Sequence, residues 1–570
     1  MEGRGPPAGV LIQMLSAARA SPDGGCAPRS PDLSFLREVI ARHAVKRAPE
    51  HRVIGMDGRP LAWIVDLREL LLRSDTLDRF AEALLDRLPA DEAVQVGGLE
   101  AAAVPLVTAV LMKARQRGRE IRGFIIRKER KRTGLGRRIE GDVRPDLPVV
   151  LLDDVLNSGD SLERARTVLA AEGLRVARVL VVLDHEAPRG LAWRERHRIA
   201  VEALFRLSEF GLASERKRLP PPEVDYEPAW SFTGITGHPF SMVPKSAPLL
   251  VGERVVLGTD AGVVIALDVA TGEVVWRRAF PNTGRKGIWS SPAYHEGRIY
   301  VGAYNGCLYA LDAATGEVAW CNPACEWIGS SPLVVARHHL VVVGLEYERP
   351  GNGGSMAAFD LTAGEKVWEH PLRVHQHGSA ADWPEGDLVV AGTNDHSLLA
   401  LRAADGTVAW DLPTGRSIKY APAVDPDRRL VASASFDGRI RVCDVATGAL
   451  RHELRTEDIC YTTPLFHGGR LFCGSGDRRL HVLDLDTGQR IAAIDCGARV
   501  YASPRAIGRS VVVGATNGVV RDLDATTLRL RGAFVVPDAV TNAVAVSDDE
   551  GLVVASTYTN GMFTFRRREL

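Results

Sequence analysis

The chain has 570 residues, of which 45% are hydrophobic and 25% are charged, a composition typical of a globular protein. With 71 basic and 71 acidic side chains the formal net charge is zero, so overall charge does not favour nucleic acid as a partner. The 8 cysteines include no CxxC pattern and no adjacent pair, which argues against a disulfide framework or a zinc site. No run of ~18 apolar residues occurs, so no membrane-spanning helix is expected.

Residues 1–30 are rich in Gly, Pro, Ala and Ser, and this composition predicts a disordered tail. The apolar stretch near the start is short and is interrupted by Gln13, and Glu2 stands close to Arg4. A secretory signal peptide would carry a stronger positive segment and a longer apolar core. We therefore expect a cytoplasmic protein that does not bind a membrane.

Residues 31–215 alternate between helical and strand patterns. Apolar residues recur with helical spacing and predict helices at 77–88, 103–118 and 161–173. Apolar and β-branched runs predict strands at 93–98, 121–128, 148–155 and 176–184. Strands that alternate with helices favour a Rossmann-like α/β domain, with a parallel sheet covered on both faces.

A charged, proline-rich segment at 216–225 predicts a semi-rigid linker to a second domain, 226–570. In that domain Asp-x-x-Thr-Gly recurs at 268–272, 312–316, 444–448 and 484–488, with degenerate copies at 360–364, 402–406 and 524–528. A period of ~40–50 residues with four short strands in each unit is typical of a β-propeller.

The number of blades follows from the two ends of the repeat region. Seven turns of this kind are followed by an eighth unit, 539–570, which holds three strands and stops where the turn should come. A tryptophan follows the first turn position by eight residues in several units, at 276, 320, 368 and 410. Trp230 stands alone before the first unit. We therefore predict eight blades, with the strand around Trp230 completing the last one and removing the exposed edges.

The stretches GVVIALDVATGEVVW (262–276) and GCLYALDAATGEVAW (306–320) resemble the tryptophan-docking repeat of PQQ-like, quinoprotein-type propellers. In this interpretation Trp packs between neighbouring blades and Asp caps its own turn. In the quinone-binding proteins that this repeat resembles, a vicinal Cys-Cys pair lies near the quinone. This chain has no such pair, so PQQ is not expected. The propeller is instead expected to bind a protein partner.

Two histidines in RVHQHGS, His375 and His377, have the i, i+2 spacing that points side chains to one face of a strand. This spacing could suggest a metal site. Because the sequence offers no identifiable third ligand, a histidine pair at the surface or at the top of a blade is the favoured interpretation.

The segment VVLLDDVLNSGDSL (149–162) joins an apolar strand to two carboxylates and then to a small polar loop. Successive N–H groups at a tight turn and a helix N-terminus form a cradle for an anion. Asp153 and Asp154 are acceptors suited to a vicinal diol. The cradle itself would consist of Asn157, Ser158, Gly159, Asp160 and Ser161. A phosphate next to a diol indicates a ribose 5-phosphate.

This segment resembles the PRPP-binding signature of type I phosphoribosyltransferases, and four further segments resemble orotate phosphoribosyltransferase: 57–71, 96–110, 124–141 and 179–190. The resemblance implies that Asp153 and Asp154 hold the ribose hydroxyls and that loop 157–161 holds the 5′-phosphate. It also implies that pyrophosphate is contacted by Arg127, Lys128 and Lys131, with Mg²⁺ carried by PRPP. A homodimer is compatible with the same resemblance.

The basic run RKERKR (127–132) has other interpretations when taken alone, as a solvated face or a nucleic-acid patch. With the family resemblance, a mobile loop that closes over PRPP is favoured. Four positions depart from the family pattern, and at two of them, near Met56 and at Ala102, a lysine of the family is missing. Thr133 replaces a histidine of this loop, and His185, in the base pocket, replaces the arginine that meets the orotate carboxylate. The acceptor base is therefore not identified.

The leading prediction is an orotate phosphoribosyltransferase-like glycosyltransferase (a pentosyltransferase) that binds PRPP with Mg²⁺ and transfers phosphoribosyl to an unknown base. The alternative is a non-catalytic scaffold that senses PRPP or a nucleotide. A quinone-dependent oxidoreductase is the third hypothesis, and it depends on the propeller resemblance alone.

Overall fold

The computed structural model describes residues 33–47, 63–90, 92–128, 138–212, 223–233, 235, 246–281, 286–347, 353–547 and 551–570. The chain separates into two compact units between Ala90 and Asp91. The predicted tail and most of the predicted linker lie outside the described residues, so the predicted domain limits stay predictions.

The described part of the first unit is mainly helical. Its elements are α1 (Ser34–Val39), the π-helical turn η1 (Ile40–Ala44), β1 (Val45–Arg47), β2 (Trp63–Val65), η2 (Leu70–Leu72) and α2 (Ser74–Leu85). β1 and β2 pair antiparallel, with Val45 opposite Val65. Helix α2 buries Phe80, Leu84 and Leu85 along one stripe, as the helical spacing of residues 77–88 predicts.

The second unit begins with a six-stranded sheet in the order β5-β4-β3-β6-β7-β8. Its strands are β3 (Gln95–Leu99), β4 (Arg122–Ile126), β5 (Ile139–Gly141), β6 (Val149–Leu156), β7 (Val176–Asp184) and β8 (Ala200–Arg206). All neighbouring pairs are parallel except β4 with β5. The predicted Rossmann-like sheet is confirmed, and β6 is paired on both sides.

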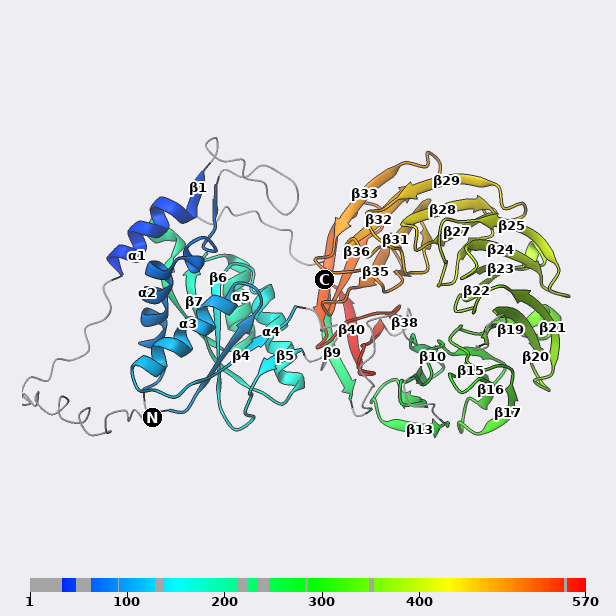
Figure 1. Cartoon of the computed structure of the whole chain (residues 1–570), viewed down its shortest axis with the longest axis horizontal. Coiled ribbons are helices and arrows are strands. Elements are labelled where there is room, and N and C mark those ends of the chain that lie inside the picture. Colours follow the sequence, from blue (N-terminus) through cyan, green and yellow to red (C-terminus); the bar gives the residue numbers. More distant parts are fainter. Residues whose placement is uncertain are drawn as a thin grey trace, which may run out of the picture. The chain divides into compact units, whose positions relative to one another are not determined.

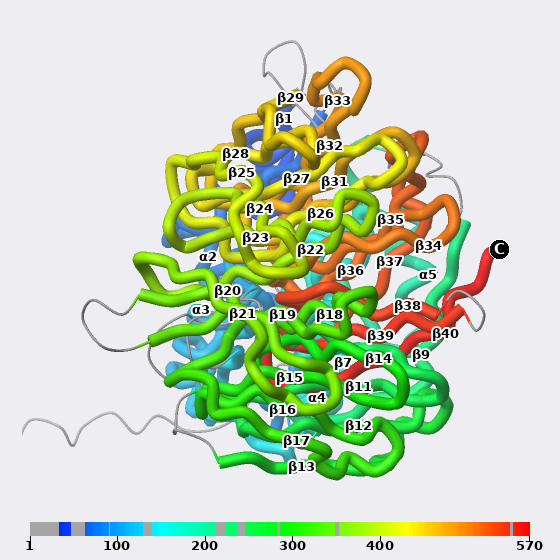
Figure 2. The backbone as a smooth tube through the Cα atoms, turned by 90° about the vertical axis from the view of Figure 1, so that its right-hand side faces the viewer, coloured from blue at the N-terminus to red at the C-terminus, as the bar shows by residue number. Residues whose placement is uncertain are grey.

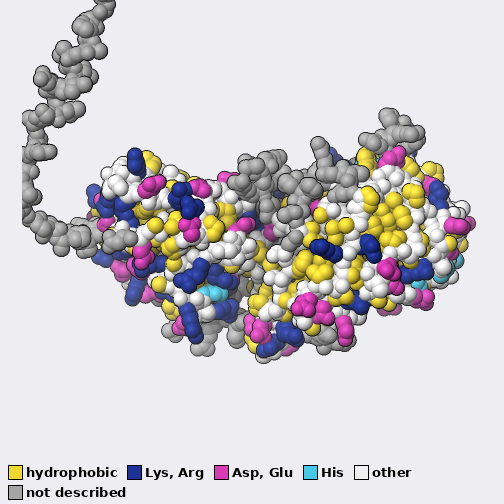
Figure 3. All heavy atoms as spheres, turned by 90° about the horizontal axis from the view of Figure 1, so that it is seen from below, with side chains coloured by type: hydrophobic (Ala, Val, Ile, Leu, Met, Phe, Trp, Pro, Cys, Tyr) yellow, Lys and Arg dark blue, Asp and Glu magenta, His cyan; other side chains and the backbone are white. Residues whose placement is uncertain are grey.

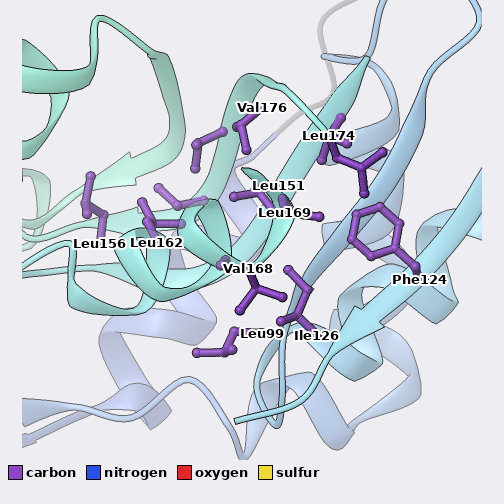
Figure 4. Close-up of a cluster of buried hydrophobic side chains, with 14 of the residues drawn as sticks. Leu99, Phe124, Ile126, Leu151, Leu156, Leu162, Val168, Leu169, Leu174 and Val176 are labelled. Carbon is purple, nitrogen blue, oxygen red and sulfur yellow. The ribbon is translucent and has the colours of Figure 1, made fainter. Parts of the chain in front are cut away.

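Three helices pack along this sheet, α3 (Ala103–Gln116), α4 (Asp160–Ala171) and α5 (Pro188–His197), and a short η3 (Leu207–Phe210) follows β8 (Figure 1). The core that α4 shares with the strands contains Leu99, Phe124, Leu151 and Leu169, each at most 5% exposed (Figure 4). Burial of such side chains contributes roughly 1.5–3 kcal/mol each and fixes the position of α4 against β6.

Among the described residues, eight four-stranded antiparallel sheets follow, as predicted. The first four blades are β10 (Leu249–Val251), β11 (Arg254–Gly258), β12 (Val263–Asp268), β13 (Val274–Ala279); β14 (Ala293–His295), β15 (Arg298–Gly302), β16 (Cys307–Asp312), β17 (Val318–Pro323); β18 (Leu333–Val335), β19 (Leu340–Glu346), β20 (Gly354–Asp360), β21 (Lys366–Leu372); and β22 (Ala380–Trp383), β23 (Leu388–Gly392), β24 (Ser397–Arg402), β25 (Val408–Pro413). Short 3₁₀ turns follow β18 and β22, η4 (Ala336–His338) and η5 (Pro384–Gly386).

The other four blades end with a strand taken from the start of the propeller. They are β26 (Ala423–Asp425), β27 (Leu430–Ala434), β28 (Arg439–Asp444), β29 (Leu450–Arg455); β30 (Leu465–His467), β31 (Arg470–Gly474), β32 (Arg479–Asp484), β33 (Arg490–Asp495); β34 (Arg505–Ile507), β35 (Ser510–Gly514), β36 (Val519–Asp524), β37 (Leu530–Val535); and β38 (Ala545–Ser547), β39 (Leu552–Ser556), β40 (Met562–Glu569) with β9 (Val224–Phe232). Figures 1 and 2 both show β9 beside β40, and Trp230 lies opposite Thr564. The predicted closure by the strand around Trp230 is confirmed.

Each tryptophan of the repeat joins its blade to the next one. The indole N–H of Trp276 donates to the carbonyl oxygen of Ala313 at 3.1 Å, and its ring covers Gly316 in the turn of the next blade. Trp230 closes the ring in the same way, donating to Val269 at 2.8 Å. The turn itself is capped by its aspartate: Asp312 accepts from the N–H groups of Ala314 and Thr315 at 2.9 and 2.8 Å. Both predicted roles, docking by Trp and capping by Asp, are confirmed.

The later joints of the ring use other side chains. His452 takes the tryptophan position of the fifth blade, and its Nε2 lies 3.0 Å from the carbonyl oxygen of Leu485. Between the last two blades Arg567, whose side chain is 8% exposed, pairs with the buried Asp522 at 2.9 Å, and Tyr226 donates to the same carboxylate at 2.8 Å. A buried ion pair costs desolvation, so each partner here depends on the other.

The turn glycine under each tryptophan permits a direct test. A Cβ on Gly316 would lie 2.5 Å from the ring of Trp276, and its φ is +71°. Gly297 of the same blade has a φ of +80° with nothing within 4 Å of such a Cβ. We expect Gly316→Ala to lose about 1–3 kcal/mol more of the free energy of unfolding than Gly297→Ala, because only the first overpacks a joint. Denaturant unfolding followed by tryptophan fluorescence measures this, and equal losses would contradict the docking role.

Candidate functional site

The site residues gather where the parallel strands end. β3 lies between β4 and β6, so the chain leaves it toward one side of the sheet and returns on the other. Ligands of open α/β sheets bind at such a switch point, outside the carboxyl ends of the strands. Asp153 and Asp154 lie near the end of β6, Arg127 and Lys128 follow β4, and β7 ends at Asp184. Parallel pairing thus brings the predicted acidic and basic residues to one edge.

The two aspartates differ in burial. Asp153 is only 7% exposed, whereas Asp154 is half-buried. The N–H of Asp154 donates to Asp153 Oδ1 at 3.0 Å, and the N–H of Val155 donates to Asp154 Oδ1 at 2.8 Å. Burial and the neighbouring Asp154 carboxylate raise the pKa of Asp153 well above its ordinary value, and the nearby Lys128 opposes that rise. The carboxyl oxygens of the two residues can together accept hydrogen bonds from two hydroxyl groups.

The predicted cradle, loop 157–161, is anchored at both ends. Leu156 closes β6 and Leu162 lies in the first turn of α4; both are buried in the same core, where Figure 4 shows them side by side. Gly159 stands at the helix N-cap position with a φ of +84°, which favours glycine. Asn157 and Asp160 are exposed, and the N–H of Asp160 faces Ser158 Oγ at 3.4 Å. The N-terminus of a 12-residue helix therefore opens at this loop and favours an anion.

Helix α5 supports the loop from outside, a role that the sequence analysis did not predict. A Cβ on Gly159 would lie 2.9 Å from Trp193, and one on Gly190 would lie 2.5 Å from the carbonyl oxygen of Asn157. The indole N–H of Trp193 donates to Glu163 Oε2 at 2.8 Å, which ties α5 to α4. In the sequence, the one sign of this contact is a glycine and a tryptophan one helical turn apart, Gly190 and Trp193. That spacing by itself does not specify which segment they pack against.

The basic residues follow β4. Arg127 is half-buried and pairs with Glu140 at 2.9 Å, while the backbone N–H of Lys128 donates to Glu100 Oε1 at 2.9 Å. Glu100 follows β3, so this bond joins the ends of two neighbouring strands. Lys128 itself is exposed. Lys131, the third predicted basic residue, lies outside the described residues, as does Thr133.

His185 follows β7, and its N–H donates to the carbonyl oxygen of Leu156 at 2.9 Å, next to the loop. Burial lowers the pKa of His185 against the opposing effect of Asp184, so the neutral imidazole is favoured at neutral pH. Asp184 is itself buried and paired with Arg194 of α5. A neutral imidazole does not offer the two-pronged cation that an arginine would present to a carboxylate.

The histidine pair of the propeller contacts a carboxylate. The rings of His375 and His377 meet edge to face with centroids 5.3 Å apart. His377 Nδ1 lies 2.9 Å from Glu346, which is buried, and 3.4 Å from the hydroxyl of Tyr304. Among the described residues no group of three or more His, Cys, Asp or Glu side chains is placed to hold a metal ion.

Comparison with known proteins distinguishes an N-terminal part of the chain from the propeller. A sequence profile described as outer membrane protein assembly factor BamB matches residues 224–291, 260–459 and 437–531, which together exceed half of the chain. An orotate phosphoribosyltransferase of Methanopyrus kandleri is 37% identical over 139 residues, 24% of this chain and 72% of that protein. The chain belongs to both families: orotate phosphoribosyltransferase in its N-terminal part and BamB in its propeller.

Two further similarities agree with this assignment. The orotate phosphoribosyltransferase of Rhodopirellula baltica is 29% identical over 187 residues, 32% of this chain and 95% of that protein. The crystal structure of BamB from Moraxella catarrhalis superposes with a TM-score of 0.50 and 16% identity, covering 60% of this chain and all of that one. At this identity the second similarity shows the propeller fold alone. No helix within the described ranges has the length and apolar character needed to cross a membrane.

The raised pKa of Asp153 predicts how stability changes with pH. An acid whose pKa is higher in the folded than in the unfolded chain costs stability as pH rises from its unfolded to its folded pKa. We therefore expect Asp153→Asn to unfold at a higher denaturant concentration than the unchanged chain at about pH 8, with a smaller gain at about pH 4.

Asp146→Asn serves as the control, because Arg144 lowers the pKa of Asp146 and the pH effect should have the opposite sign. If Asp153→Asn gave no gain at the higher pH, the carboxyl would not be held in the folded chain as described.

Proposed function

We propose that the chain binds PRPP with Mg²⁺ and is a transferase that moves the phosphoribosyl group to an acceptor base other than orotate. The observation that carries the proposal is the arrangement at the end of β6, where a buried and a half-buried carboxylate stand just before a loop at the N-terminus of α4. Membership of the orotate phosphoribosyltransferase family supports it.

The proposed roles follow from the placement of each group. Asp153 and Asp154 would accept hydrogen bonds from the ribose hydroxyls, and loop 157–161 would hold the 5′-phosphate with N–H groups. Arg127, Lys128 and Lys131 would stabilise the negative charge that develops on the leaving pyrophosphate. Mg²⁺ would bind phosphate oxygens of PRPP and neutralise part of that charge, since it prefers such ligands. These residues thus favour departure of pyrophosphate from the ribose carbon that the base attacks.

The acceptor is proposed to lack the carboxylate of orotate. His185 stands at the position of the family arginine, and its lowered pKa leaves it neutral at neutral pH. A neutral imidazole has one donor and one acceptor nitrogen and no charge, which suits a ring carbonyl or ring nitrogen better than a carboxylate.

The second candidate is a scaffold that binds PRPP or a nucleotide without turnover. Thr133 in place of the loop histidine favours it, because a threonine hydroxyl, unlike an imidazole, does not exchange its proton by ionising near neutral pH and is a poor general acid or base. In either case the propeller is proposed to bind a protein in the cytoplasm. The outermost strands of the blades expose Val274, Val367, Leu450 and Leu530 at 48–53%, and Figure 3 shows hydrophobic side chains between charged ones on the viewed face.

Binding of PRPP is tested by calorimetric titration of the full chain with PRPP and Mg²⁺. We expect heat of binding from the unchanged chain and none from the double variant Asp153→Asn, Asp154→Asn, because both diol acceptors lose their charge. Asp146→Asn, an exposed carboxylate paired with Arg144, is the matched control and should bind normally. An unchanged chain that does not bind PRPP would exclude the proposal.

Turnover is tested separately by measuring pyrophosphate release from PRPP in the presence of a panel of bases that includes orotate and uracil. We expect release that depends on one base and falls at least about 100-fold in Lys131→Ala, the size of effect typical for loss of one transition-state contact. Binding of PRPP without release for any base would favour the sensing scaffold. Release with orotate as the best acceptor would contradict the proposed role of His185.

A further inference from the structure

The phosphate loop of this chain contains a negative charge of its own. Asp160 is the first residue of α4, so its backbone N–H belongs to the N-terminal end of the helix while its side chain carries a carboxylate. Arg189, in the first turn of α5, lies with Nη2 at 3.0 Å from Asp160 Oδ1. The side chain of Arg189 is 53% exposed and that of Asp160 is 55% exposed, so both are open to a ligand from solvent.

A carboxylate at this place opposes the proposed ligand. The partial positive charge of a helix N-terminus attracts either the Asp160 side chain or a phosphate group, and the two anions repel each other. With Asp160 alone, the loop would be a poorer phosphate site than a loop of neutral residues. The charge of the nearby Arg164 also acts on Asp160. Its Nε, however, donates to the carbonyl oxygen of Asp160 at 3.3 Å, whereas Arg189 pairs with the carboxylate itself.

The position of Arg189 is set by the packing of α5 against the loop. On one side of it, Gly190 closes against the carbonyl oxygen of Asn157, and one turn further Trp193 covers Gly159. These two contacts fix the first turn of α5 beside the start of α4. Arg189 is therefore carried by a helix that is packed on the loop itself, which distinguishes it from a chance partner on a freely moving segment.

We propose that Arg189 is a positioning residue of the phosphate site: it neutralises Asp160 and thereby allows loop 157–161 to accept a phosphate dianion. The inference rests on the proposed function, in which this loop holds the 5′-phosphate of PRPP. The opposing view is that Arg189 and Asp160 form an ordinary exposed ion pair, which would contribute little to stability and nothing to binding.

The test is a double-mutant cycle on the full chain, read out by titration with inorganic phosphate and, separately, with PRPP and Mg²⁺ at fixed ionic strength. We expect Arg189→Ala to weaken phosphate binding about tenfold or more, because the Asp160 charge is then uncompensated. In a chain that already carries Asp160→Asn, the same Arg189→Ala change should cost less than about threefold. Arg178→Ala, which breaks a less exposed pair with Glu202 at 2.9 Å, should change neither titration.

Each result decides the inference. Equal losses in the two backgrounds would show that Arg189 does not act through Asp160 and would overturn it, as would unchanged phosphate binding in Arg189→Ala or no phosphate binding by the unchanged chain. The expected cycle with inorganic phosphate, combined with failure to bind PRPP, would uphold the neutralised phosphate loop and reject the proposed function. The expected cycle with both ligands supports the two together.

Discussion

The pairing of β6 with β3 on one side and β7 on the other is the interaction on which the candidate site depends. Because these strands are parallel, the residues that follow them meet at one edge of the sheet. Leu156 and Leu162 then hold the two ends of the loop in the core, so the loop itself is free to be polar. A change that moved β6 by one residue would displace the carboxylates, the loop and the start of α4 together.

One part of the candidate site matches the pattern of orotate phosphoribosyltransferase more completely than the other. The part that would contact ribose and phosphate keeps its acidic pair and its glycine with positive φ, which depend on backbone geometry. The part that would contact the base has a neutral histidine at position 185, and there recognition of the base depends on the chemistry of that single side chain. An enzyme can exchange the second kind of residue without disturbing the fold, and such an exchange changes which acceptor is bound.

Much of this architecture could be predicted from sequence, because it is written in local patterns. The repeat of Asp, Gly and Trp predicts the blade turns, and Trp230, isolated before the first unit, predicts the closing strand. Contacts between elements had no such signal. The support of loop 157–161 by Trp193, and the use of His452 in a tryptophan position, arise only when distant segments meet. Periodicity specifies which face of an element is buried and says little about the partner that covers it.

The strand exchange in the last blade has a consequence for how the protein is made. β9 is synthesised before all other strands of the propeller, but its hydrogen-bonding partner β40 is synthesised only after the seven other blades. Segments that emerge first generally fold first, so the α/β part and the early blades can form while β9 still lacks its neighbour. During translation one strand edge therefore stays unpaired until β40 has been made, and a ribosome that stalls before β40 would leave an open ring exposed to aggregation.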